Sequence, residues 1–408
     1  MKKDVGIFKS SEDRDGADVV MIVAGEASGD LHGSNLVKAM KNRDPDLRFT
    51  GIGGENMAEA GVNLLFSSSE MAVVGVTEVF SKLQPILRAR RQLKSILKQG
   101  LVNLLILIDY PDFNLNLAKT AKRYRIPVLY YISPQVWAWR RGRVKKIRRR
   151  VERMAVILPF EEAFYKGYDM SVDYVGHPLL DAWETSERSR ASEEVGEASC
   201  GKPLIGILPG SRREEVHQLL PVMVEALGIL KARYPRLEAV LPLAPTIDRN
   251  MVEDMIRGAS VKIRARKGDI YRLLSPCQMA LVASGTAALE TAIAGVPMVI
   301  LYKVSPLSYW IGRMVIQVPY ISLVNLVAQQ RIVPELIQND VEPHYIAELV
   351  VSMLEDEHVV TTMKEGLRRV RKSLGKGGAS RQTAHIALSM MNKEQMKGPY
   401  RGENHSGR

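Results

Sequence analysis

Leu104-Leu105-Ile106-Leu107-Ile108 is an entirely apolar run, and it leads directly into Asp109-Tyr110-Pro111-Asp112-Phe113-Asn114. An apolar run of this length is typical of a strand buried in a parallel sheet. A carboxylate straight after such a strand lies at the carboxyl edge of the sheet, where ligands bind in open α/β folds. Asp109 is therefore our candidate general base, because partial burial shifts a carboxyl pKa toward neutrality. For Asp112 or Asn114 the alternative is a capping role in the next helix.

Short apolar runs alternate with amphipathic segments along the whole chain, which predicts βα units over parallel sheets. In the first half the expected strands are Val19–Val23, Arg48–Ile52, Leu104–Ile108, Pro127–Ile132, Ala155–Leu158 and Val172–Val175. In the second half they are Leu204–Leu208, Leu237–Pro242, Val261–Ala265, Met279–Val282 and Met298–Tyr302. We therefore expect an α/β protein with two Rossmann-like parallel-sheet domains that face each other across a cleft.

The domain boundary is expected at Glu184 to Lys202, which is rich in Ser, Glu and Arg and lacks apolar periodicity. Helical periodicity in Tyr345–Glu355 and Val359–Leu374 predicts helices that pack back over this linker. The expected organisation is a flexible N-terminus (1–17), an N-terminal domain (18–183), the linker (184–202), a C-terminal domain (203–375), and a C-terminal helix with a disordered tail (376–408).

Composition sets outer limits on function. The 408 residues, 46% of them hydrophobic and 25% charged, suffice for two domains with full cores. A formal charge of +12 favours an acidic or phosphorylated partner. The two cysteines, Cys200 and Cys277, have neither disulfide nor metal spacing, which fits a reducing cytoplasm. Met1 to Asp18 has no apolar signal core, and no apolar stretch approaches the roughly 20 residues of a membrane span.

A glycine-rich turn, Ala24-Gly25-Glu26-Ala27-Ser28-Gly29-Asp30, follows the first expected strand. Such a turn brings the backbone close to a ligand and points helix amides at it. Its spacing is not Gly-x-Gly-x-x-Gly, so it gives little support to a dinucleotide site. A tight strand-to-helix turn would explain the glycines, but it leaves Glu26, Ser28 and Asp30 without a role.

Two further turns of this kind occur in the second half. Pro209-Gly210-Ser211-Arg212 precedes a helix and adds a guanidinium, which suits a diphosphate. Ser284-Gly285-Thr286 begins another helix, and Glu290 inside it could accept hydrogen bonds from a ribose diol. Each turn alone could be a tightly packed junction, but the two together favour a nucleotide site.

Tryptophan and positive charge meet in Ser133-Pro134-Gln135-Val136-Trp137-Ala138-Trp139-Arg140. Arg140 to Arg153 then holds nine Lys or Arg residues and one Glu. Aromatic side chains beside dense positive charge suit a large amphipathic ligand that carries phosphate. The alternative is an anchored interdomain helix with a solvated basic face.

A basic amphipathic segment, Ser81 to Lys98, follows the apolar stretch Met71 to Val79. This combination is what binding to an anionic lipid surface requires. The residues expected to meet lipid are Val73, Val74, Val76, Arg88, Arg90 and Arg91. The alternative is a helix that faces the protein core and turns a hydrated basic side to solvent.

In combination, these segments resemble the lipid-A-disaccharide synthases, glycosyltransferases with the two-domain GT-B fold. The segments that carry the resemblance are 24–30, 109–114, 133–140, Leu158-Pro159-Phe160-Glu161, Gly176-His177-Pro178, 208–212, 283–290 and Tyr320-Ile321-Ser322-Leu323-Val324-Asn325-Leu326. They occur in order between about Val19 and Leu374. The chain departs from the family pattern at Gln135 and Val324.

The resemblance implies an inverting transferase. It would condense UDP-2,3-diacylglucosamine with 2,3-diacylglucosamine 1-phosphate and release UDP, with neither metal nor other cofactor. It makes Asp109 the general base and Arg212 a catalytic diphosphate contact. The donor residues would be Gly210, Ser211, Arg212, Ser284, Gly285, Thr286, Glu290 and Asn325. The acceptor side would hold Glu26, Ser28, Gly29, Asn114 and Trp137.

Because both substrates would be acylated, the expected location is cytoplasmic, peripheral on the inner face of the cytoplasmic membrane, with a homodimer as a possibility. Two rival interpretations are a UDP-sugar epimerase of the same fold and a basic RNA-binding protein. The chain lacks the interleaved stacking aromatics of an RNA-binding surface, so we expect no nucleic-acid partner. The sequence leaves open the acyl chain length and whether Arg140–Arg153 meets membrane or acceptor phosphate.

Overall fold

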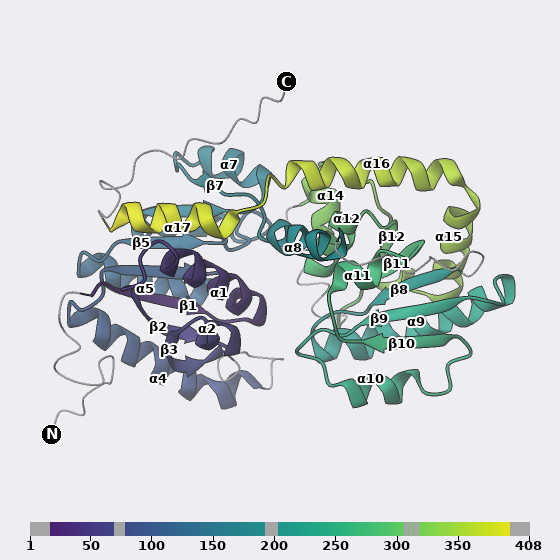
Figure 1. The fold of residues 1–408 in the computed structure, drawn as a ribbon, viewed down its shortest axis with the longest axis horizontal. Coiled ribbons are helices and arrows are strands. Elements are labelled where there is room, and N and C mark those ends of the chain that lie inside the picture. Colours follow the sequence, from purple (N-terminus) through teal and green to yellow (C-terminus); the bar gives the residue numbers. More distant parts are fainter. Residues whose placement is uncertain are drawn as a thin grey trace.

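The chain folds into two parallel sheets, each covered by helices, which lie next to each other (Figure 1). The computed structural model describes residues 17–68, 78–191, 203–305, 309, 313 and 318–391, with the backbone alone at 78–83 and 188–191. The first sheet has seven strands in the order β3-β2-β1-β4-β5-β6-β7, and the second has six in the order β10-β9-β8-β11-β12-β13. The expected α/β class with two parallel-sheet domains is confirmed.

The first domain is built from residues 18–176 together with the last described helix. Its strands are β1 (Val19–Ala24), β2 (Arg48–Gly53), β3 (Val62–Ser67), β4 (Leu104–Ile108), β5 (Val128–Tyr131), β6 (Arg153–Val156) and β7 (Asp173–Tyr174). Its helices are α1 (Ala27–Lys41), α2 (Glu55–Glu59), α4 (Glu78–Lys98), α5 (Pro111–Arg123), α6 (Val144–Arg150), α7 (Pro159–Lys166) and α17 (Ala379–Met390), with a short 3-10 turn at Arg141–Arg143.

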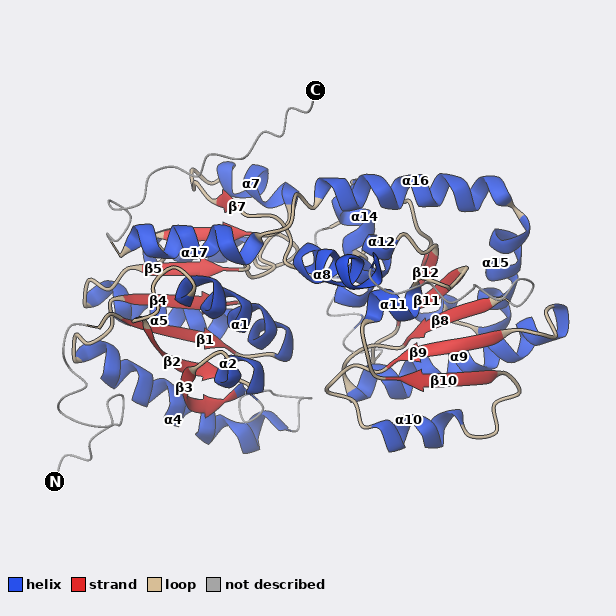
Figure 2. Cartoon of the chain, in the orientation of Figure 1, coloured by secondary structure: helices blue, strands red, loops and turns tan. Residues whose placement is uncertain are grey.

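The second domain follows the same plan (Figure 2). Its strands are β8 (Leu204–Leu208), β9 (Glu238–Pro242), β10 (Lys262–Arg266), β11 (Met279–Ala283), β12 (Met298–Tyr302) and β13 (Glu335–Ile337). Its helices are α8 (Leu179–Ala191), α9 (Arg213–Arg233), α10 (Arg249–Ile256), α11 (Ile270–Leu274), α12 (Thr286–Ala294), α14 (Leu323–Ala328), α15 (Pro343–Glu355) and α16 (Glu357–Ser373), with a 3-10 turn at Gln338–Asp340.

The strand predictions hold best for the buried central strands. β4, β8 and β12 have the expected bounds, whereas β6 begins two residues earlier than expected, at Arg153, and ends at Val156. Two strands, β3 and β13, were not predicted. Both are edge strands. β13 has only three residues, too few for a strand pattern, whereas β3 contains Val62, Leu64, Leu65 and Phe66 and could have been found.

The expected linker is wrong in its first part, because residues 184–191 belong to helix α8. This helix is fixed to the second domain. The Tyr271 hydroxyl donates to the Leu179 carbonyl at 3.0 Å, and the Trp183 and Tyr271 rings meet edge to face at 5.3 Å. Packing against Tyr271, far along the chain, thus orders this helix although its polar sequence did not predict one.

The chain crosses between the domains a second time after α16, and the two crossings touch. The His177 amide donates to the Leu374 carbonyl at 2.9 Å. Gly176 has φ +77°, and a Cβ there would lie 2.8 Å from the Lys376 carbonyl oxygen. Helix α17 then packs against α1 of the first domain (Figure 1). The C-terminal helices therefore return over the first crossing, as expected, while the predicted tail after 391 lies outside the described residues.

Helix α4 faces the protein core, which was one of the two alternatives for the basic amphipathic segment. Ala89, Leu93, Ile96 and Leu97 are fully buried in the core of the first domain, so this face meets protein and not lipid. Arg88 and Arg91 are exposed and Arg90 is half-buried. The lipid-facing valines Val73, Val74 and Val76 lie outside the described residues. Within the described part of the chain, no helix is long and apolar enough to cross a membrane.

Candidate active site

Parallel register brings the ends of three strands together. Ala24 of β1 pairs with Ile108 of β4, and Ile108 pairs in turn with Tyr131 of β5. The glycine turn after β1, the Asp109 segment after β4 and the tryptophan segment after β5 therefore begin at one level of the sheet. This is the carboxyl edge, where the sequence predicted a site.

Asp109 is held in an unusual backbone conformation. Its φ is +41° and that of Tyr110 is +47°, in the left-handed region, which costs a non-glycine residue roughly 1–3 kcal/mol. The surroundings fix it there. The Asn114 amide donates to the carbonyls of Ile108 and Asp109 at 3.1 and 2.7 Å, and the Tyr130 hydroxyl donates to the Asp109 carbonyl at 2.5 Å.

These contacts correct two expectations. Asn114 is fully buried and uses its amide to position Asp109, so in this structure it offers no amide hydrogen to an acceptor sugar. Neither Asn114 nor Asp112 caps helix α5, because the capping position falls on Tyr110, whose side chain makes no capping hydrogen bond.

The electrostatics of Asp109 suit a general base. Burial raises the pKa of its carboxyl to about 6, and the negative charge of Glu26 adds to this rise. A backbone hydrogen bond from Tyr110 and the positive charge of Arg212 act in the opposite direction. A base with a pKa near 6 is ionised at neutral pH and can still hold a proton during reaction.

The turn after β1 contributes charge as well as close packing. Glu26 and Ser28 are exposed at the start of α1. A Cβ on Gly25 would lie 2.5 Å from the Tyr110 ring, and one on Gly29 would lie 3.3 Å from the Ala24 Cβ. Gly29 is therefore a packing residue, while Glu26 and Ser28 face solvent at the edge where Asp109 lies.

Asp30, in the same turn, is structural. Its buried carboxylate accepts the backbone amides of Gly54, Asn56 and Met57 at 2.6–3.1 Å. These amides begin helix α2, so Asp30 caps it and is unavailable to a ligand.

Arg212 reaches across from the second domain. Its guanidinium lies 3.9 Å from the Glu26 carboxylate and 3.6 Å from the Glu215 carboxylate, and about two thirds of its side chain is exposed. Together with the influence of Arg212 on the pKa of Asp109, this places the guanidinium at the same site as the candidate base. The expected cation thus faces Glu26 and Asp109 over the interdomain cleft.

The turn that carries Arg212 differs from the prediction in one respect. The Glu215 carboxylate accepts the amides of Ser211 and Arg212 at 3.2 and 3.3 Å. Gly210, with φ +118°, has no room for a Cβ, which would lie 2.3 Å from that carboxylate. In this arrangement the two amides are occupied, so Arg212 can bind a diphosphate through its side chain only.

The second turn is more open. The Ser284 hydroxyl donates to the Ile321 carbonyl at 3.2 Å, whereas a Cβ on Gly285 would have nothing within 4 Å. Thr286 is exposed at the first position of α12. Glu290 lies one turn further along, where burial raises the pKa of its carboxyl to about 7. Among the described residues, Glu290 has no ion-pair partner, which leaves it able to accept a ribose hydroxyl.

Asn325 does not offer a free group to the donor. It is fully buried, and its amide nitrogen donates to the Val333 carbonyl and the Glu335 carboxylate at 2.9 and 2.8 Å. Its oxygen accepts the amides of Ile332 and Val333 at 2.8 and 3.1 Å. All of its hydrogen bonds thus hold the loop before β13, so it shapes the donor side indirectly.

Trp137 is buried beside Glu161, for which the sequence predicted no role of its own. The indole Nε1 donates to Glu161 Oε1 at 3.2 Å, and Glu161 Oε2 accepts the amides of Ile157 and Leu158 at 3.2 and 2.9 Å. Burial raises the pKa of Glu161 to about 7. Glu161 lies three residues after the capping position, as in a capping box, but that position is Leu158 and not the Ser, Thr, Asp or Asn that makes the motif readable in sequence.

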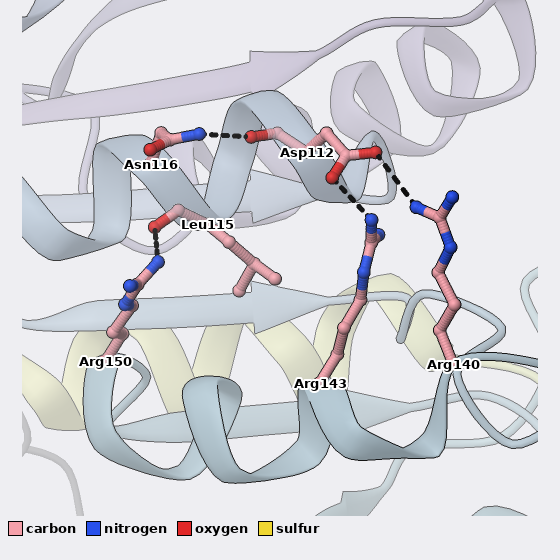
Figure 3. Close-up of polar contacts among 6 residues, drawn as sticks. All are labelled: Asp112, Leu115, Asn116, Arg140, Arg143 and Arg150. Carbon is pink, nitrogen blue, oxygen red and sulfur yellow. Dashed lines mark hydrogen bonds and ion pairs between the residues drawn. The ribbon is translucent and has the colours of Figure 1, made fainter.

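The basic run is partly neutralised by helix α5 (Figure 3). Arg143 and Arg140 pair with Asp112 at 2.6 and 3.9 Å, and Arg150 donates to the Leu115 carbonyl at 3.0 Å. Val144 and Ile147 are buried beneath it. The run therefore forms a short anchored helix whose remaining exposed cations include Lys145, Lys146 and Arg149.

Comparison with known proteins identifies the family of this chain. The family model described as lipid-A-disaccharide synthetase matches residues 20–389. The lipid-A-disaccharide synthase of Geobacter sulfurreducens is 46% identical over 376 residues, covering 92% of this chain and 98% of the relative. The chain belongs to the lipid-A-disaccharide synthase family. The synthase of Syntrophus aciditrophicus is 47% identical over 377 residues, with the same coverage.

Solved structures confirm the GT-B fold expected of this family. The S. aureus MnaA–UDP structure has a TM-score of 0.62 at 13% identity and covers 94% of this chain and 100% of that one. MurG of Acinetobacter baumannii has a TM-score of 0.55 at 14% identity and covers 92% and 100%. Identities this low show the fold alone. The family match, and not these neighbours, leaves the epimerase alternative without support.

The first prediction concerns Asp109. Replacement by Asn should lower turnover by about 10²- to 10⁴-fold, because the amide cannot accept the hydroxyl proton. UDP affinity, measured by calorimetry, should be nearly unchanged.

The activity of the wild type should also depend on pH, because kcat/KM should fall below about pH 6 as the Asp109 carboxylate becomes protonated. Because Glu26 raises this pKa, Glu26→Gln should move the acid limb to lower pH. An unshifted limb, or near-normal turnover in Asp109→Asn, would refute the assignment.

The second prediction concerns Arg212. Arg212→Ala should weaken donor binding and slow the chemical step, because its guanidinium would offset the charge that grows on a departing diphosphate. Arg212→Lys should recover activity only partly, since an ammonium lacks the bidentate fork. Arg213→Ala is a matched control, because Arg213 is the exposed neighbour that follows it. Full activity with unchanged donor affinity in Arg212→Lys would exclude the contact.

Proposed function

We propose that this protein is an inverting hexosyltransferase that makes a lipid A disaccharide. It would transfer 2,3-diacylglucosamine from UDP to the 6-hydroxyl of 2,3-diacylglucosamine 1-phosphate, giving the disaccharide 1-phosphate and UDP. The family membership supports the reaction. The observation that carries the assignment to this site is the approach of Arg212 to Glu26 and Asp109 between the two domains.

In the proposed reaction, Asp109 removes the proton of the acceptor 6-hydroxyl. The resulting oxygen attacks the anomeric carbon on the face opposite UDP, the bond to the β-phosphate oxygen breaks, and the configuration inverts. Arg212 stabilises the charge on the leaving diphosphate, because a cation close to developing negative charge lowers its energy. Ser284, Gly285 and Thr286 lie beside the phosphates, and Glu290 binds the ribose.

Arg212 must exchange partners for this to occur. In the structure its nearest anions are the carboxylates of Glu26 and Glu215. A diphosphate carries more charge than either carboxylate, so donor binding would draw the guanidinium away from them. Loss of its pairing with Glu26 would also leave that carboxylate free to meet the acceptor.

Both proposed substrates are acylated, so we place the enzyme on the inner face of the cytoplasmic membrane as a peripheral protein. The exposed cations Arg88 and Arg91 on α4 support contact with anionic lipid, which attracts basic helices. Because the apolar face of α4 packs in the core, apolar contact with lipid falls to the preceding segment with Val73, Val74 and Val76. A homodimer stays a prediction.

The experiment that tests the function, and our third prediction, is incubation with UDP-2,3-diacylglucosamine and the monosaccharide 1-phosphate. Mass spectrometry should detect a disaccharide 1-phosphate, and UDP should appear in equal amount. Asp109→Asn is the matched negative control, because it alters one atom of the proposed base. Conversion of the UDP-sugar to an isomer without acceptor would overturn the proposal in favour of the epimerase.

The fourth prediction concerns the membrane. Replacing Val73, Val74 and Val76 with Ser should reduce sedimentation with vesicles by orders of magnitude, since each apolar side chain that leaves lipid loses roughly 1.5–3 kcal/mol. The melting temperature should stay unchanged. Normal vesicle binding with a lowered melting temperature would mean that these valines belong to the core.

Removing positive charge from α4 tests the membrane contact independently. Neutralising Arg88, Arg90 and Arg91 to Gln should weaken binding about fivefold per charge, on anionic vesicles and at low salt. The matched control removes three cations from α16 in the other domain: Arg368, Arg369 and Lys372. Equal losses in the two triple variants would show that net charge, and not α4, directs the binding.

A further inference from the structure

A pocket of about 300 Å³ is lined by residues of both domains. The first domain lines it with Trp137, Phe160 and Phe164 and with the guanidinium-bearing Arg141. The second domain closes it with the segment from Val318 to Gln329. Its lining is mainly apolar, with a single charged residue, which distinguishes it from the polar donor turns.

The aromatic wall is rigid. The Trp137 ring is fixed by its hydrogen bond to the buried Glu161 and meets Phe160 edge to face at 4.9 Å. Phe164 packs edge to face on Tyr165 at 5.1 Å. Because the one indole donor is already used by Glu161, this wall presents hydrocarbon and not hydrogen-bonding groups. A sugar or a nucleobase would find few polar partners there, and burying its polar groups unpaired is costly.

The opposite wall is tied to the donor side. Glu335 accepts the amides of Ile321 and Ser322 at 3.0 and 2.9 Å and binds Asn325, so the segment that includes Tyr320 and Leu326 is held from within. The Ser284 hydroxyl, in the turn assigned to the donor phosphates, donates to the Ile321 carbonyl. One hydrogen bond thus joins the segment that forms this wall of the pocket to the turn where the donor is expected.

The first-domain wall of the pocket follows a strand that neighbours the strand of the candidate base, Asp109. Trp137 follows β5, whose residue Tyr131 is in register with Ile108, immediately before Asp109. A ligand whose hydroxyl meets Asp109 can therefore extend over the end of the neighbouring strand into this pocket. Arg141 begins the 3-10 turn after the tryptophan segment, where a phosphate on that ligand would meet a cation.

From this arrangement we propose that the pocket binds one fatty acyl chain of the acceptor, with Arg141 beside the sugar phosphate. The inference rests on the proposed function and goes beyond it by assigning the acyl subsite. An apolar pocket with one cation on its lining matches an amphipathic sugar phosphate in both chemistry and polarity. Glu161 acts as a positioning residue, because it touches Trp137 and not the ligand.

The test uses the dependence of rate on acyl chain length. Val318→Phe places a ring in the pocket and should shift preference toward shorter chains, whereas Leu326→Ala enlarges it and should shift preference toward longer ones. The quantity measured is the ratio of kcat/KM for a long-chain and a short-chain acceptor, on one enzyme preparation. That ratio cancels any change in the folded fraction. Each methylene excluded from the pocket should cost about fourfold.

Arg141→Gln supplies the second arm. It should raise the acceptor KM about tenfold with little effect on kcat at saturation, and it should weaken inhibition by inorganic phosphate competing with acceptor. Arg149→Gln is the matched control, since it removes an exposed cation from the same run outside the pocket. Equal effects of the two variants would overturn the assignment of Arg141.

The outcomes separate this inference from the proposed function. If the wild-type enzyme forms no disaccharide 1-phosphate, the function itself fails. If it does, but chain-length preference is unchanged in Val318→Phe and Leu326→Ala, the acyl subsite fails alone. A shift in preference for the chain length of the UDP-sugar, with none for the acceptor, would overturn the acceptor assignment and give the pocket to the donor.

Discussion

The parallel register of β1, β4 and β5 is the constraint on which the site depends. Because Ala24, Ile108 and Tyr131 pair across three neighbouring strands, their following segments must leave the sheet at one edge. Those segments carry Glu26, Asp109 and Trp137. Every strand of both sheets runs parallel to its neighbours, so each domain gathers its polar turns in the same way, and the cleft lies where the two sets of turns meet.

Charge balance at that edge is set by contacts from both domains. Glu26 raises the pKa of Asp109 and Arg212 lowers it, so the affinity of the base for a proton depends on how closely the domains approach. The Glu215 carboxylate holds the backbone of the Arg212 turn while leaving its guanidinium partly exposed. A buried base with one anionic and one cationic neighbour can therefore respond to the arrival of a charged donor.

Sequence patterns predicted the central strands, the two-domain class and the position of Asp109, because buried parallel strands and their terminal turns are encoded locally. The roles of Asn114 and Asn325 could not be predicted that way. Each is fully buried, and its hydrogen bonds are fixed by backbone groups that become neighbours only after folding. Residues 184–191 of helix α8 were taken for linker, because the order of this helix comes from Tyr271, far along the chain. Glu161 was given no role of its own, because Leu158 at the capping position is not a usual capping residue.

Helix α17 makes the first domain discontinuous in sequence. It packs against α1 and buries Ala384 and Ala387 in the core, yet it follows the entire second domain. During synthesis, domains fold largely in order from the N-terminus, but this one cannot be completed until the other has emerged from the ribosome. The second domain is in effect an insertion near the end of the first. Its folding has to bring residues 176 and 375 back together before the chain can finish the domain with which it began.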